Sequence, residues 1–188
     1  MDYNCQTKCV PPVNGTDGRE ACRKFWIAVY TRPRSEKKVA KVLEASGVEV
    51  YLPIQTQIRK WSDRKKKIEV PVIPMVVFVK VNECQIANIS QHSLVIKFIS
   101  RPGENKAACI PEIQINNLKF ILGQSDIPVE FDSNPYKIND SVEVIRGYFK
   151  GLKGEIHDCP DGTTDLIVRI DLLGGAKLKI NKQDLIHI

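Results

Sequence analysis

The sequence predicts an α+β protein with two domains, an antiparallel sheet flanked by helices and then a small β-barrel. Residues 25–123 alternate β-branched segments with amphipathic helical patterns in the order β-α-β-β-(α)-β-α, which favours a helix-covered sheet. Residues 141–188 instead carry short alternating segments punctuated by six glycines, which is typical of a small barrel. The 188 residues are 43% hydrophobic and 27% charged, so a disordered or fibrous chain is excluded.

The first elements are a strand and a helix. Residues 25–30 are aromatic and β-branched, as in a strand. A helix follows, with Ser35 as its N-cap and Gly47 as its C-terminal stop. Three apolar residues at i, i+3 and i+4 are expected to form its buried stripe: Val39, Val42 and Leu43.

A hairpin is expected next. Residues 48–58 predict a second strand, and residues 61–67 a polar, basic hairpin tip. Residues 68–81 predict the return strand, which Pro71 and Pro74 interrupt. Proline lacks a backbone N–H, so these two residues indicate an edge or a bulge.

The N-terminal domain is expected to end with a short helix near Ile86 and Ile89, a strand over residues 94–99, and a longer helix. Pro111 opens that helix and Gly123 ends it. Its buried face is expected to hold four apolar residues: Ile115, Leu118, Ile121 and Leu122.

Four segments follow from these patterns. They are a flexible tail over residues 1–23, an N-terminal domain over 24–123, a linker over 124–138, and a C-terminal domain over 139–188. Residues 124–140 contain two prolines, an acidic excess and no periodicity, which is the composition of a linker.

The positive charge is concentrated in one segment. The chain has a net charge of +6, yet residues 23–67 alone carry thirteen basic and four acidic residues. Clustered lysine and arginine bind phosphates and release counterions, so this segment is the candidate nucleic-acid surface. The alternative is a solvated face that serves solubility. Two groups of candidates result. The first follows the first strand and comprises Arg32, Arg34, Lys37 and Lys38. The second surrounds the hairpin tip and comprises Arg59, Lys60, Trp61, Arg64 and Lys65, with further charge from Lys66 and Lys67, and its tryptophan suits single-stranded nucleic acid.

No cofactor or metal is expected. The six cysteines are irregularly spaced, which favours reduced thiols over disulfides. Cys5, Cys9 and Cys22 are the alternative, a zinc site, but no fourth ligand has suitable spacing. Apolar runs such as residues 75–79 are far short of a membrane span, and no secretory signal is evident, so a cytoplasmic protein is expected.

An enzyme is not expected. The sequence contains no phosphate-binding loop, no zinc-protease motif and no dinucleotide fingerprint. His92, His157 and His187 are separated in the chain and accompany no recognisable nucleophile motif.

Two sets of residues resemble one known family. Residues 140–156, DSVEVIRGYFKGLKGEI, resemble a KOW motif, which forms an SH3-like β-barrel. Residues 26–30 (WIAVY), the basic helix after them, residues 73–79 (IPMVVFV) and residues 95–99 (VIKFI) resemble the N-terminal domain of the NusG family. The resemblance covers residues 25–188 in the family's order.

The resemblance implies a transcription elongation factor. NusG-type proteins bind RNA polymerase through the N-terminal domain, span the DNA cleft and disfavour pausing, while the KOW barrel contacts factors such as ribosomal protein S10 or Rho. It implies a monomer that contacts DNA or nascent RNA, with no membrane partner. The implied polymerase-docking residues are Tyr30, Ile73, Val76, Phe78 and Phe98, and the implied KOW contacts are Tyr148 and Phe149.

One difference from the family's housekeeping sequence pattern favours a specialised role. Where the housekeeping form usually has Pro-Gly-Tyr, this chain has Pro74, Met75 and Val76, and it adds a tail and a basic hairpin. These features resemble specialised paralogues such as RfaH and the antiterminators of polysaccharide operons. One family member refolds its C-terminal domain between a helical hairpin and a barrel. Here Gly147, Gly151 and Gly154 would each cost a helix about 1 kcal/mol, so a constitutive barrel that presents Phe149 is expected.

Two alternatives remain open. Housekeeping NusG is the nearer one. A KOW-containing ribosomal or RNA-binding protein is the other, although residues 141–188 carry seven basic and seven acidic residues and so lack the charge expected of it.

Overall fold

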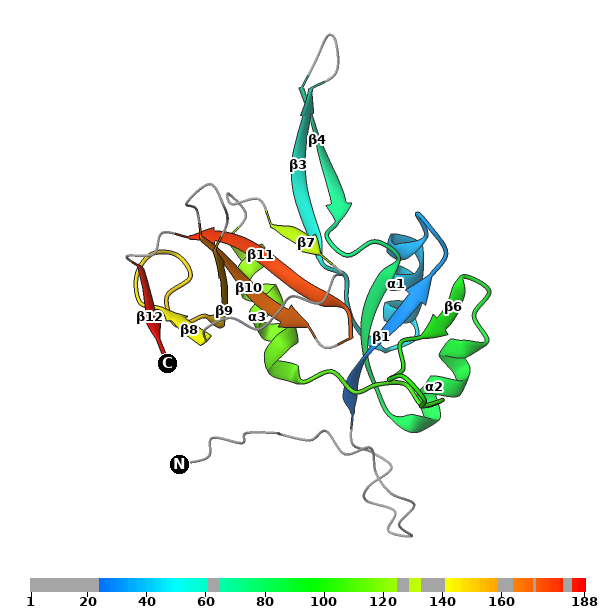
Figure 1. Ribbon diagram of the computed structural model, residues 1–188. Helices are drawn as coiled ribbons and strands as arrows, with labels where there is room; N and C mark the ends of the chain where they lie inside the picture. Colours follow the sequence, from blue (N-terminus) through cyan, green and yellow to red (C-terminus); the bar gives the residue numbers. More distant parts are fainter. Residues whose placement is uncertain are drawn as a thin grey trace. The chain divides into compact units, whose positions relative to one another are not determined.

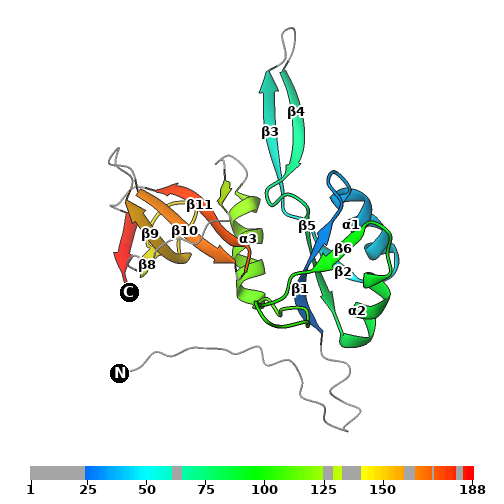
Figure 2. The ribbon, with the colours of Figure 1, turned by 45° about the vertical axis from the view of Figure 1, so that its right-hand side comes forward.

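The structure, a computed structural model, describes residues 24–60, 65–124, 129–132, 141–158, 164–170, 172–180 and 184–188. Figures 1 and 2 show its helices and strands. The described residues form two compact units, the first comprising residues up to Tyr51 together with Val77–Glu112, and the second comprising Leu52–Val76 and Ile113–Ile188. Helix α3 (Glu112–Gly123) is therefore grouped mainly with the C-terminal strands, and the domain boundaries expected from sequence stay a prediction.

A four-stranded sheet forms the first unit. Its order is β2-β5-β1-β6, with β1 at Phe25–Thr31, β2 at Glu49–Tyr51, β5 at Val76–Val81 and β6 at Val95–Phe98. The central strands β1 and β5 are almost entirely buried, because Ile27, Val29, Val77 and Val79 have no exposed surface. Helices α1 (Glu36–Ala45) and α2 (Glu83–Ser90) lie on the same side of this sheet in Figure 2.

The helix boundaries follow local signals in the sequence. Ser35 occupies the N-cap of α1, as expected, although its side chain makes no capping hydrogen bond. Gly47 follows α1 with φ 77°, the left-handed conformation that ends many helices. Asn82 caps α2 with a complete capping box that includes Gln85, a signal that periodicity alone did not supply.

The two long strands expected over residues 48–58 and 68–81 are each broken. The first becomes β2 and β3 (Ile54–Lys60), interrupted at Leu52 and Pro53. The second becomes β4 (Lys65–Pro71) and β5, interrupted over residues 72–75. The breaks meet, because the Val72 amide donates to the Pro53 carbonyl at 2.8 Å. The prolines remove ladder hydrogen bonds at these places, so β3 and β4 separate from the main sheet as their own two-stranded ribbon.

Met75 lies in the second break with φ 62°, a left-handed conformation that glycine adopts readily and methionine does not. This is the position at which the housekeeping pattern has glycine. The backbone shape is therefore glycine-like although the residue is not, at a cost of about 1–2 kcal/mol.

A six-stranded antiparallel sheet dominates the second unit, in the order β12-β8-β9-β10-β11-β7. Its strands are β7 (Glu130–Asp132), β8 (Ser141–Val144), β9 (Lys153–Asp158), β10 (Thr164–Ile170), β11 (Gly174–Ile180) and β12 (Leu185–His187). The described part of residues 141–188 is thus built of strands, as expected. Strand β7 was not expected, because it lies in the segment interpreted as a linker and pairs Phe131 with Ala176.

Candidate functional site

The basic residues after β1 all lie on the surface. Arg32, Arg34, Lys37 and Lys38 are exposed, in the turn before α1 and in its first turn. The turn is ordered by two backbone hydrogen bonds, from the Arg32 amide to the Leu94 carbonyl at 2.9 Å and from the Ser35 amide to the Arg32 carbonyl at 3.1 Å. The structure therefore brings these four cations to one end of the first unit, where a phosphate chain could contact them.

Arg34 holds a strained backbone in that turn. Its φ is 61°, in the left-handed region that costs a non-glycine residue about 1–2 kcal/mol. The side chain is exposed, so packing in the core does not repay this cost. A strained, exposed arginine is more typical of a binding residue than of a structural one.

We expect Arg34→Gly to raise the free energy of unfolding by about 0.5–1 kcal/mol, because it relieves the left-handed strain, and to weaken binding to nucleic acid. Arg34→Ala is the matched control, since it removes the same charge and keeps the strain. Urea denaturation and fluorescence anisotropy with labelled DNA measure the two effects. Equal stability of the glycine and alanine variants would contradict the strain, and unchanged DNA affinity in both would contradict the contact.

The hairpin candidates are only partly covered by the structure. Trp61 and Arg64 lie outside the described residues. Arg59, Lys60 and Lys65 are placed by backbone register only, Arg59 opposite Lys66 and Lys60 opposite Lys65. Lys66 and Lys67 are exposed. The sequence had suggested that they belong to a hairpin tip, but they lie in strand β4.

The expected polymerase-docking residues do not form one surface. Ile73, Val76 and Phe78 are buried, and the ring of Phe78 stacks on Tyr51 with the centroids 6.1 Å apart. Val76 and Phe78 pack in the interior because β5 is an inner strand of the sheet, and Ile73 is buried in the break that precedes β5. Burial also raises the pKa of the Tyr51 hydroxyl well above its usual value.

Tyr30 and Phe98 are half-buried but lie on opposite faces of the sheet. In the β1–β6 register Tyr30 is opposite Lys97, and Phe98 is opposite the buried Val29. Residues directly opposite one another project from the same face of an antiparallel pair, so the two aromatic rings cannot belong to one patch. Of the five expected residues, only Tyr30 remains both accessible and on the face that also carries Trp26.

Two cations lie over aromatic rings on that face. The Lys97 ammonium is 5.6 Å from the centroid of the Tyr30 ring, and the Lys80 ammonium is 5.8 Å from that of Trp26. Lys80 also donates to Glu112 Oε1 at 2.7 Å, and this hydrogen bond holds the pKa of Lys80 above its ordinary value. Lys97 was missed from sequence because its proximity to Tyr30 depends on strand register.

In the C-terminal sheet the structure separates the two expected partner contacts. Tyr148 is 76% exposed, whereas Phe149 is 4% exposed. The Phe149 ring meets the edge of Phe120 from α3, with the centroids 6.4 Å apart. The expectation that Phe149 is presented to a partner is therefore wrong for this conformation.

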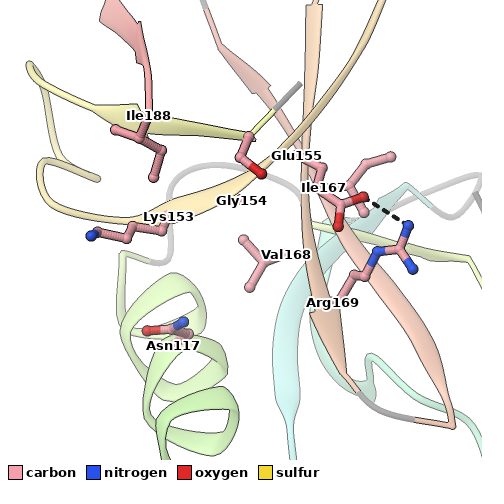
Figure 3. A pocket seen from close by; sticks show the side chains of 9 residues that line it. Asn117, Lys153, Gly154, Glu155, Ile167, Val168, Arg169 and Ile188 are labelled. Atoms are coloured by element: carbon pink, nitrogen blue, oxygen red, sulfur yellow. Dashed lines mark hydrogen bonds and ion pairs between the residues drawn. The ribbon is translucent and has the colours of Figure 1, made fainter. Parts of the chain in front are cut away.

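A shallow pocket of about 260 Å³ lies beside β9 and β10 in the second unit (Figure 3). Two cations line it, and each has a carboxylate partner. Arg169 Nη2 lies 2.7 Å from Glu155 Oε2, and Lys153 Nζ lies 3.7 Å from Glu143 Oε2. Because these charges are paired, the pocket is not a ready anion site. Within the described ranges no cluster of three or more histidine, cysteine or acidic residues could hold a metal ion, and none of their helices is long and apolar enough to cross a bilayer.

Comparisons with known proteins find similar solved structures. The solved structure of Thermotoga maritima NusG, concerned with domain interaction, is 22% identical, covering 89% of this chain and 99% of that chain with a TM-score of 0.49. The MjSpt4:Spt5 complex is similar in conformation B at 15% identity, covering 87% of this chain and 96% of that chain with a TM-score of 0.30. No curated protein matches the sequence.

The family model described as transcription termination factor NusG matches residues 24–119, just over half of the 188-residue chain. The matched segment contains the whole four-stranded sheet, both basic groups and Tyr30. The chain therefore belongs to the NusG family of transcription factors.

Proposed function

We propose that this protein is a transcription elongation and antitermination factor that binds RNA polymerase through its N-terminal domain and suppresses pausing or termination. The observation that carries the proposal is the family match over residues 24–119. The proposed organisation is an N-terminal domain over residues 24–123, a linker over 124–138 and a KOW barrel over 139–188, for which the C-terminal antiparallel sheet is the support.

The proposed role is specialised, at particular operons such as those for surface polysaccharides. Met75 supports this, because it occupies a left-handed position where the housekeeping pattern has glycine. The exposed cations at Arg32, Arg34, Lys37 and Lys38 are the proposed contact with DNA or nascent RNA. Tyr148 is the proposed contact of the KOW barrel with a factor such as ribosomal protein S10 or Rho.

The polymerase contact is proposed to centre on Tyr30. It is the candidate that is accessible beside an exposed cation, Lys97, and tyrosine is one of the residues enriched at binding hot spots. Phe98 is a matched control, since it is also half-buried, in the neighbouring strand, but on the other face.

Tyr30→Ala is expected to weaken binding to RNA polymerase core enzyme about 30-fold, the equivalent of a 2 kcal/mol hot spot, and to shorten read-through in a transcription assay. Phe98→Ala is expected to change both by less than about threefold. Binding is measured by biolayer interferometry, with thermal unfolding to show that both variants fold. Equal losses in the two variants would exclude the Tyr30 face. A wild-type chain that does not bind polymerase would exclude the function.

The breadth of action separates the specialised role from the housekeeping alternative. Deletion of the gene is expected to change transcription of one or a few long operons. A change across most genes would instead identify the housekeeping factor, and co-purification with ribosomal subunits without polymerase would identify the RNA-binding alternative.

A further inference from the structure

The β3–β4 ribbon is a separate element. Its two strands pair with each other through seven register pairs, from Ile54 opposite Pro71 to Lys60 opposite Lys65. In the described residues neither strand joins another sheet. Figures 1 and 2 show an extended antiparallel pair, which at seven residues a strand is about 20 Å long.

The register places like charges opposite each other in the distal half of the ribbon, the half that ends at the pair of Lys60 and Lys65. Arg59 is opposite Lys66, and Lys60 is opposite Lys65, while Lys67 is opposite Ile58. These three rungs contain five basic residues and no acidic one. Like charges directly opposite each other destabilise an antiparallel pair, so these rungs lower the stability of the isolated ribbon. An anionic partner would remove this cost.

The charge is carried on both faces of the ribbon. Successive rungs of an antiparallel pair project alternately to the two faces. The rung of Arg59 and Lys66 therefore belongs to one face, and its neighbours, the rung of Lys60 and Lys65 and the rung of Lys67, belong to the other. The proximal rungs lack this excess, since Gln57 is opposite Ile68 and Thr56 is opposite Glu69. The cationic zone is thus short, distal and two-faced.

A two-faced cationic ribbon fits a groove with phosphates on both sides. The major groove of duplex DNA is about 12 Å wide and admits a two-stranded β-ribbon. A single strand, or one face of an acidic protein, would contact one face of the ribbon and leave the other charged rungs unsatisfied. The deep, narrow major groove of duplex RNA would exclude the ribbon.

We propose that the distal half of the β3–β4 ribbon inserts into the major groove of duplex DNA and binds phosphates of both strands without regard to sequence. This inference deepens the nucleic-acid contact of the proposed function and rests on it for its place in transcription. Arg59, Lys60, Lys65, Lys66 and Lys67 supply the contacts. Neutralising up to five phosphates predicts a slope of log affinity against log salt of up to about −4.5.

Fluorescence anisotropy of the full chain with a 20-base-pair DNA duplex, the same single strand and an RNA duplex tests the proposal. The DNA duplex is expected to bind most tightly. Lys66→Gln with Lys67→Gln is expected to lower duplex affinity about tenfold and make the salt slope shallower by about two. The matched control, Arg101→Gln with Lys106→Gln, removes the same charge from an exposed loop outside the ribbon and is expected to leave both quantities nearly unchanged.

A second variant separates binding from folding. Lys66→Glu sets an acidic residue opposite Arg59, so the ribbon amides are expected to exchange more slowly with solvent while duplex affinity falls. Unchanged duplex affinity in the Lys66 and Lys67 variants, or tighter binding of the single strand or the RNA duplex, would overturn the inference. Polymerase binding is measured in parallel and is expected to persist in the ribbon variants. Lysine-dependent duplex binding by a chain that fails to bind polymerase would overturn the function and leave the ribbon inference standing.

Discussion

Phe78→Ala is expected to lower the free energy of unfolding of the N-terminal unit by about 3–5 kcal/mol, the usual cost of truncating a buried phenylalanine. The ring has no exposed surface and stacks on Tyr51, and its strand β5 lies between β2 and β1. Truncation removes these contacts and leaves a cavity that an inner strand cannot close by shifting. Any loss of polymerase binding would then follow from unfolding and not from a missing contact.

Urea denaturation monitored by circular dichroism measures this cost, and Phe78→Leu is the matched control because it keeps an apolar side chain of similar reach. The leucine variant is expected to lose less than half as much stability and to retain polymerase binding. A Phe78→Ala protein that is as stable as the wild type but cannot bind polymerase would restore Phe78 as a docking residue.

The burial of Phe78 was within reach of the sequence. Residues 75–79 form an unbroken apolar run, and a strand without alternation is typical of burial on both faces. The accessibility of Tyr30 was not within reach of the sequence. Its strand, Phe25–Thr31, is also mostly apolar, and the exposure of Tyr30 depends on where β6 ends beside β1. Composition identifies an inner strand, but it does not identify which of its residues reaches the surface.

Elements defined by local signals were mostly predicted. In α3 the residues Ile115, Leu118 and Ile121 are buried and the helix ends at Gly123, as expected, although Leu122 is only half-buried. In α1 the expected stripe is wrong at Val42, which is 44% exposed. Features that depend on pairing were not predicted. The opposition of Arg59 to Lys66 needs the register of β3 and β4, and β7 is stabilised by partners in β11 that lie more than forty residues away in the chain. Such short strands acquire their conformation from tertiary contacts and not from their own propensity.

Phe149 illustrates how two adjacent residues acquire opposite environments. The loop that carries them turns back on itself, with Gly147 and Gly151 at φ 79° and 86°, conformations that favour glycine. The Gly151 amide donates to the Val144 carbonyl at 2.7 Å, which closes the loop. Closure directs Phe149 onto Phe120 and leaves Tyr148 in solvent.

Phe149→Ala is therefore expected to lower the free energy of unfolding of the C-terminal sheet by about 3–5 kcal/mol, because it removes a buried ring and its edge contact with Phe120. Tyr148→Ala is the matched control, and its stability is expected to change by less than about 0.5 kcal/mol, as is usual for an exposed side chain. Amide hydrogen exchange over β8 and β9 measures the difference residue by residue. Fast exchange is expected in the Phe149 variant, and exchange at the wild-type rate is expected in the Tyr148 variant.

Partner binding is expected to depend on Tyr148 and not on the aromatic ring of Phe149, the reverse of their effects on stability. Tyr148→Ala should weaken binding of a KOW partner, tested with purified ribosomal protein S10 and Rho, while the sheet stays folded. Phe149→Leu keeps the interior filled, so it should retain both stability and binding, because the aromatic ring serves packing and not recognition. A Phe149→Leu protein that exchanges like the wild type yet loses its partner would show that Phe149 leaves α3 to make the contact, and the buried conformation would then be a resting state.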